Sequence, residues 1–82
     1  MADKRHTPRQ RALKSGKIIL KGGSVFDCLV RNLSETGALI EIASSLGVPD
    51  RFDLVIGQAP QEQTRQARVV RREATRLGVA FD

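Results

Sequence analysis

The sequence has 82 residues, with 14 Lys or Arg against nine Asp or Glu, and its formal net charge is +5. This length predicts one small domain, and a single cysteine and a single histidine exclude an intramolecular disulfide and a Cys/His zinc site within one chain. We find neither a membrane-spanning apolar run nor a signal peptide, so we expect a cytoplasmic protein of bacterial type without membrane insertion. The excess positive charge indicates an anionic partner.

Residues 1–15 are predicted to be a flexible basic arm. Pro8 disfavours a helix at the residue before it, and the segment has no apolar periodicity. Its basic residues are Lys4, Arg5, Arg9, Arg11 and Lys14. Residues 16–82 are then the predicted folded domain, in which we find no internal repeat and no second domain.

Short stretches with an apolar period of two follow the arm and predict β-strands. The predicted strands cover residues 18–20, 24–33, 37–42, 52–56, 65–72 and 77–81. Turn-forming residues separate these stretches, as at Gly22-Gly23, and no window has a helical apolar stripe. We therefore predict an all-β fold, a sandwich or a barrel, and closure into a barrel would leave less sheet edge exposed.

The predicted core is mostly aliphatic. Phe26, Phe52 and Phe81 lie at inward phases of their strands and are expected to be its aromatic members. Cys28 shares the inward phase of Phe26, so we interpret it as a small core residue rather than a reactive thiol.

Arg5 and Arg9 are the first candidate ligand-binding residues. They lie four positions apart on a segment that is not predicted to be helical, so their side chains can converge on one anion. A guanidinium pairs through two hydrogen bonds with a phosphate or with the O6 and N7 atoms of guanine. The alternative interpretation is a solvated basic tail that keeps the protein soluble.

The segment 32–37, Asn-Leu-Ser-Glu-Thr-Gly, lies between two predicted strands. Its composition is typical of a tight turn with Gly37 at positive φ. The same turn would display the Asn32 amide and the Ser34 hydroxyl, and Gly37 would let a flat ligand approach the backbone. Taken alone, this segment is therefore open to a purely structural interpretation.

The two segments together resemble the ligand-binding signature of PilZ domains, which is Arg-x-x-x-Arg followed by Asp or Asn-x-Ser-x-x-Gly. Here the signature is Arg-His-Thr-Pro-Arg at 5–9 and Asn-Leu-Ser-Glu-Thr-Gly at 32–37. Ala-Arg-Val-Val-Arg at 67–71 and Leu-Gly-Val-Ala-Phe at 77–81 are also similar to sequences of that family. The resemblance covers nearly the whole chain.

The resemblance implies a six-stranded antiparallel β-barrel that binds cyclic di-GMP, a dianion of two guanosines joined by two phosphodiesters. By position, Arg5 and Arg9 would contact phosphate and the O6/N7 edge of guanine. Asn32, Ser34 and Gly37 would lie on the other side of the base. No cofactor besides this ligand is implied.

The sequence departs from the family pattern at Asn32, at Arg71 and after the last predicted strand. Asn32 stands where many family members have Asp, and it offers an acceptor without the negative charge. Arg71 occupies a position that is commonly aromatic in the family, and its guanidinium could stack on a base instead. Arg11 is a further candidate phosphate contact. Many members also continue into a C-terminal helix, which this sequence does not contain.

The sequence contains no pattern typical of an enzyme, since it has no nucleophile–base pair, metal-ligand cluster or phosphate-binding loop. We expect the arm to fold over the nucleotide and an unidentified effector protein to recognise the changed surface. One alternative is a PilZ-like interaction module without nucleotide binding, which Asn32 leaves open. Another is a basic β-barrel that binds RNA or single-stranded DNA. The lack of Trp and Tyr argues against nucleic acid, because such surfaces stack bases on exposed aromatic residues.

Overall fold

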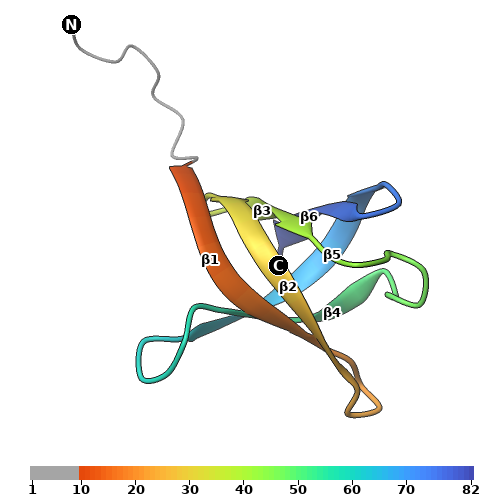
Figure 1. Ribbon diagram of the computed structural model, residues 1–82, viewed down its shortest axis with the longest axis horizontal. Coiled ribbons are helices and arrows are strands. Elements are labelled where there is room, and N and C mark those ends of the chain that lie inside the picture. Colours follow the sequence, from red (N-terminus) through yellow and green to blue (C-terminus); the bar gives the residue numbers. More distant parts are fainter. Residues whose placement is uncertain (1–9) are drawn as a thin grey trace, which may run out of the picture.

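The structure, a computed structural model, describes residues 10–82 of the chain, with side chains from Leu13 onward. The elements in this range are all β-strands (Figure 1). They are β1 (Gln10–Ile19), β2 (Val25–Leu33), β3 (Gly37–Glu41), β4 (Arg51–Ile56), β5 (Gln63–Arg72) and β6 (Arg76–Phe81). All pairs are antiparallel, and the order β1-β2-β3-β6-β5-β4 closes into a barrel. The predicted all-β class and six-stranded barrel are confirmed. Within this range no helix could cross a membrane.

Strand β1 begins earlier than the sequence predicts. We expected the basic arm to extend to residue 15, but β1 starts at Gln10, and Gln10 lies opposite Leu33 of β2. The sequence of the first half of β1 has no apolar alternation, and this part of the strand joins the sheet by pairing with β2. Residues 1–9 of the predicted arm lie outside the described residues. The other five strands match the predicted ranges to within two residues.

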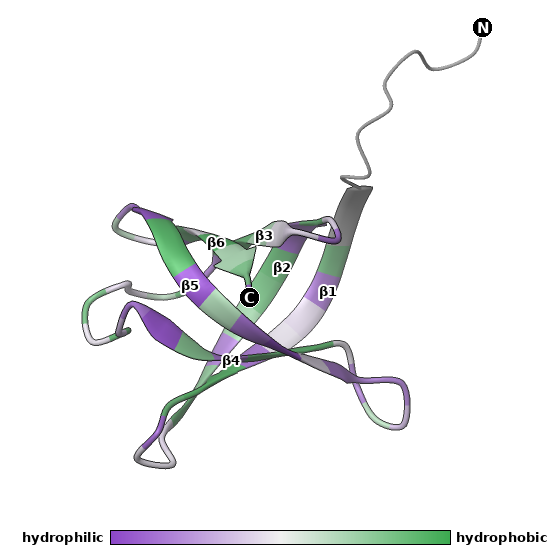
Figure 2. Ribbon diagram, turned by 180° about the vertical axis from the view of Figure 1, so that it is seen from behind, coloured by the Kyte–Doolittle hydropathy of each residue, from purple (hydrophilic) through white to green (hydrophobic). Residues whose placement is uncertain are grey.

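The core lies inside the barrel and is formed by alternate residues of the strands. Ile18, Val30, Ile40, Leu54 and Leu77 are fully buried. Figure 2 shows the corresponding alternation of hydrophobic and hydrophilic residues along the strands. The period of two in the sequence therefore identifies the inner face correctly.

The three phenylalanines do not share one environment. Phe52 is buried and Phe81 packs against the core, as predicted, but Phe26 is 36% exposed. Phe26 lies near the tip of the β1–β2 hairpin, and β2 pairs with β3 only from Leu29 onward. β2 extends past its pairing with β3 into the β1–β2 hairpin (Figure 1), and Phe26 lies in that extension, outside the core cluster. The prediction that Phe26 is a core residue is wrong for this reason.

Candidate functional site

The predicted site residues divide into two groups. Arg5 and Arg9 lie outside the described residues. Asn32 is the penultimate residue of β2, and Ser34 and Gly37 form the β2–β3 turn and the start of β3. This turn lies at the end of the barrel where β1 begins, because the first residue of β1 pairs with the last residue of β2.

The strand register places three candidates, Arg11, Asn32 and Arg71, in one row across five strands. Arg11 of β1 lies opposite Asn32 of β2, and Asn32 lies opposite Leu39 of β3. Leu39 in turn pairs with Gly78 of β6, and Gly78 with Arg71 of β5. We call these five positions the cross-strand row. Leu39 and Gly78 alternate with buried residues on β3 and β6, so the row follows the outer surface of the barrel there.

The Ser34 side chain is used within the turn itself. Its hydroxyl oxygen accepts hydrogen bonds from the backbone N–H groups of Thr36 at 3.2 Å and Gly37 at 3.1 Å. The hydroxyl can donate to the Gly37 carbonyl at 3.2 Å, and that carbonyl also accepts from the Ser34 N–H at 2.9 Å. Ser34 therefore fixes the shape of the turn, as Ser commonly does through side-chain-to-backbone bonds.

Gly37 is required by its neighbour on β6 rather than by its own backbone angle. The positive-φ glycines are Gly23, Gly47 and Gly57, so the predicted positive φ at Gly37 is wrong. A Cβ atom at Gly37 would instead overlap the carbonyl oxygen of Val79. Only glycine permits the close approach of β3 and β6 at this point.

The comparison with known families agrees with this geometry. The sequence matches the family model of the PilZ domain over residues 3–82. The chain belongs to the PilZ domain family. Domains of this family are non-catalytic binding domains and generally act as cyclic di-GMP receptors. None of the curated proteins searched matches the chain.

Two shallow hollows flank the cross-strand row of this PilZ domain. The first has a volume of about 300 Å³ and is lined by Leu13, Arg31, Asn32, Leu39 and Arg76. The second, of about 120 Å³, is lined by Leu39, Arg71, Glu73, Arg76 and Gly78. Sequence reasoning missed Arg31 and Arg76, because neither belongs to the signature and β6 joins β3 only in the folded barrel.

Arg71 borders the second hollow and remains accessible. Its Nε atom lies 3.5 Å from a carboxylate oxygen of Glu73, and 75% of its side chain is exposed. An exposed ion pair of this kind contributes at most about 1 kcal/mol. Gly78, its partner on β6, carries no side chain, so nothing at that position separates Arg71 from Leu39. The geometry therefore permits Arg71 to lie against a flat ligand on the row.

Arg65 of β5 connects that strand to the β2–β3 turn. Its guanidinium lies over the Phe81 ring, 4.2 Å from the ring centroid, and one of its N–H groups donates to the Glu35 carbonyl at 3.1 Å. The Phe81 N–H donates to the Thr36 carbonyl at 2.8 Å. Arg65 and Phe81 thus hold the turn from β5 and β6. Sequence reasoning had no signal for this contact, since Arg65 and Glu35 are 30 residues apart.

Cys28 belongs to the core rather than to a reactive site. The side chain is partly buried and packs against the core cluster, as predicted. Burial raises the pKa of the Cys28 thiol to about 11, and the neighbouring Asp27 carboxylate acts in the same direction. In the part of the chain that the structure describes, no three His, Cys, Asp or Glu residues are grouped as metal ligands.

We expect Cys28 to react slowly with iodoacetamide in the folded protein. Near pH 8 its thiolate fraction is about one hundredth of that of a thiol with the ordinary pKa of 9.0. Alkylation should therefore be about a hundredfold slower than in the urea-unfolded chain at the same pH. Because the folded pKa is raised, this thiol contributes stability below pH 9 that is lost as the pH rises toward 11. Equal alkylation rates in the folded and unfolded chain would contradict the assignment.

Proposed function

We propose that this PilZ domain binds cyclic di-GMP on its outer surface along the cross-strand row. The observation that carries the proposal is the pairing of Arg11 with Asn32, which joins the start of β1 to the second half of the signature. Arg9 precedes Arg11 by two residues, and two residues of chain span at most about 7 Å. Both halves of the signature can therefore reach one ligand.

The side chains of the row, together with Arg5 and Arg9, suit a guanine nucleotide. Arg5 and Arg9 would pair with the phosphodiester groups and with the O6/N7 edge of guanine through their planar guanidiniums. Asn32 offers an amide oxygen that can accept from the N1 and N2 donors on the opposite edge of the base. Arg11 and Arg71, at the two ends of the row, would supply further positive charge or stacking to the dianion.

Ser34 and Gly37 contribute to this function mainly through shape. The Ser34 hydroxyl is engaged by the backbone of its own turn, and Gly37 allows β3 to approach β6. The turn that results presents Asn32 beside the open surface of the row. A ligand can also meet the backbone of Gly37, so direct contact there is compatible with the same geometry.

Signalling would proceed through the arm and a partner protein. Once Arg5 and Arg9 engage the nucleotide, residues 1–9 would close over it, and an effector protein would recognise the combined surface. A non-catalytic domain can transmit the signal only through such a change of shape or surface. Amide hydrogen exchange of residues 1–9 should therefore slow on addition of cyclic di-GMP, and equal exchange in both states would argue against this step.

Calorimetric titration with cyclic di-GMP tests the proposal. We expect saturable binding by the wild-type chain and at least a tenfold weaker affinity in Arg9→Ala, the loss expected for one charge-assisted pair. Arg51→Ala is the matched control, because it removes the same charge from a side chain that lines neither hollow beside the row and instead pairs with Asp82.

The competitors separate the proposed function from its alternatives. GTP and a short single-stranded oligonucleotide should not displace cyclic di-GMP at equal concentration. No heat with cyclic di-GMP would indicate a PilZ module without nucleotide binding. Salt-sensitive binding of the oligonucleotide instead would indicate a nucleic-acid-binding barrel.

A further inference from the structure

Two arginines beside the cross-strand row share one carboxylate. Glu41 of β3 lies between Arg31 of β2 and Arg76 of β6. One Glu41 oxygen is 3.3 Å from Nη1 of Arg31, and the other is 3.3 Å from Nη2 of Arg76. The side chains of Arg31 and Arg76 are 43% and 50% exposed, whereas that of Glu41 is 29% exposed. The carboxylate is therefore the most buried member of this group.

Each of these ion pairs is weak. Both join a single nitrogen to a single oxygen at 3.3 Å, whereas a strong arginine–carboxylate pair uses two parallel hydrogen bonds at shorter distances. A guanidinium has five N–H donors, so each arginine retains donors that Glu41 does not use. A phosphate oxygen could take those donors without first breaking a strong pair.

The position of Arg31 follows from an irregularity in β2. The β2–β3 register shifts between Val30 and Asn32, so Arg31 has no partner position on β3. Both Arg31 and Arg76 line the same 300 Å³ hollow as Asn32. The residues that line this hollow include two arginines and no carboxylate, and Leu39 provides an apolar side.

We infer that Arg31 and Arg76 form a phosphate subsite of the nucleotide site, with Glu41 as a built-in counter-ion that weakens it. The inference rests on the proposed function, because it extends the same site from Asn32 toward β6. Phosphate binding would draw the two guanidiniums from single contacts with Glu41 to paired hydrogen bonds with the phosphate oxygens. Glu41 repels the same anion, and its charge therefore limits the affinity.

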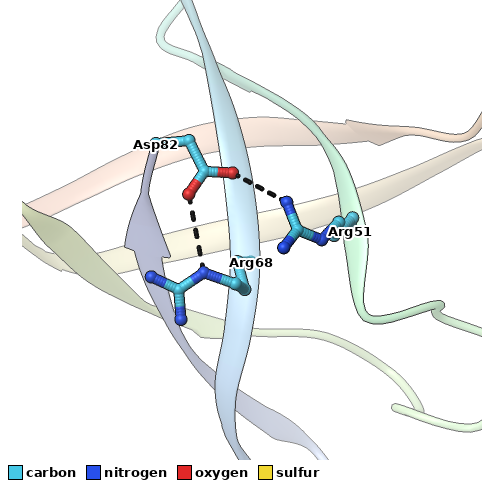
Figure 3. Close-up of polar contacts among 3 residues, drawn as sticks. All are labelled: Arg51, Arg68 and Asp82. Carbon is cyan, nitrogen blue, oxygen red and sulfur yellow. Dashed lines mark hydrogen bonds and ion pairs between the residues drawn. The ribbon is translucent and has the colours of Figure 1, made fainter.

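A second group of the same composition provides a control within the molecule. Asp82 lies between Arg51 and Arg68, at 3.2 Å and 3.5 Å (Figure 3). The hollow beside it is lined by two cations, Lys21 and Arg51, and by two carboxylates, Asp53 and Asp82. Its charges balance, so we expect no phosphate subsite there.

The direct test is a titration of the full chain with inorganic pyrophosphate, followed by NMR of the arginine Nε–H groups. We expect saturable shifts at Arg31 and Arg76 and weaker, non-saturating ones at Arg51 and Arg68. Glu41→Gln should bind pyrophosphate about threefold to tenfold more tightly, since it removes a nearby negative charge but keeps the shape. Asp82→Asn, which makes the same change in the control group, should leave the affinity unchanged within about twofold.

Calorimetry with cyclic di-GMP connects the subsite to the nucleotide. Arg76→Met keeps the apolar stem of the side chain and should weaken binding about tenfold, while Arg51→Met should not. Wild-type-like binding by Arg76→Met, or equal pyrophosphate shifts at Arg76 and Arg51, would overturn the inference while leaving the proposed function intact. If the wild-type chain bound no cyclic di-GMP, the proposed function would fail, and the pyrophosphate titration would still decide whether the subsite exists.

Discussion

Gly37→Ala should reduce the free energy of unfolding by about 3 kcal/mol or more, because the new methyl group would overlap a backbone carbonyl that cannot rotate away. The carbonyl belongs to Val79, whose own side chain is buried in the core. Relief therefore requires β3 and β6 to separate where Gly37 pairs with Ala80. Urea unfolding monitored by circular dichroism would measure the change.

Gly22→Ala is the control for this substitution. Gly22 lies in the β1–β2 hairpin, and a Cβ atom there would meet no other atom within 4 Å. We expect its free energy of unfolding to stay within about 0.5 kcal/mol of wild type, as for most surface substitutions. If Gly37→Ala were as stable as Gly22→Ala, the close approach of β3 and β6 would not be the reason for glycine at this position.

Gly37→Ala also helps to distinguish a structural role from direct ligand contact, which the signature sequence alone cannot do. In the sequence, Asn32, Ser34 and Gly37 appear as three equivalent ligand contacts. In the structure, Ser34 and Gly37 satisfy the turn and the β3–β6 contact, and Asn32 borders a hollow beside two arginines. Substitutions at Ser34 and Gly37 should therefore reduce stability and binding together, whereas Asn32→Ala should act mainly on binding.

The fold could be predicted from the sequence because most of its strands bury alternate residues. Ala38, Ile40 and Ile42, for example, are buried as their spacing indicates. The start of β1 could not be predicted, since its sequence has no apolar alternation and it joins the sheet by pairing with β2. For Phe26 the sequence predicted a burial that the structure does not have. The inward phase of a residue does not guarantee that a neighbouring strand extends far enough to cover it.

The cross-strand row could not be predicted from spacing, because three register shifts determine it. The shifts occur between Arg11 and Lys14, between Val30 and Asn32, and between Val69 and Arg71. Each lies next to a member of the row, and each changes which residues face one another across the strands. Nothing in the local sequence identifies these bulges. The hollow shared by Asn32 and Arg76 therefore becomes visible only in the folded barrel.

Arg65→Ala should also have a large effect, although Arg65 lies outside the signature. The substitution removes the stacking of the guanidinium on Phe81 and the hydrogen bond to the Glu35 carbonyl. A cation–π contact at a partly exposed site contributes about 0.5–1 kcal/mol, and a hydrogen bond to a charged group about 1.5–3 kcal/mol. After allowance for exposure, we expect a loss of about 2 kcal/mol, equivalent to a decrease of about 10 °C in Tm.

The location of the effect distinguishes a clamp on the turn from a general loss of stability. In Arg65→Ala, amide exchange at Glu35, Thr36 and Gly37 should accelerate more than exchange at the β1–β2 hairpin, because the contacts that Arg65 loses are with Glu35 and Phe81. A double-mutant cycle with Phe81→Leu should give a coupling energy of about 1 kcal/mol, because each single substitution removes the same stacking contact.

Arg51→Ala, which removes an exposed arginine from a surface ion pair, should cost no more than about 0.5 kcal/mol. If Arg65→Ala behaved like Arg51→Ala, the turn would be held by its own hydrogen bonds and by the backbone bond from Phe81 to Thr36, and the Arg65 side chain would have no part in positioning it.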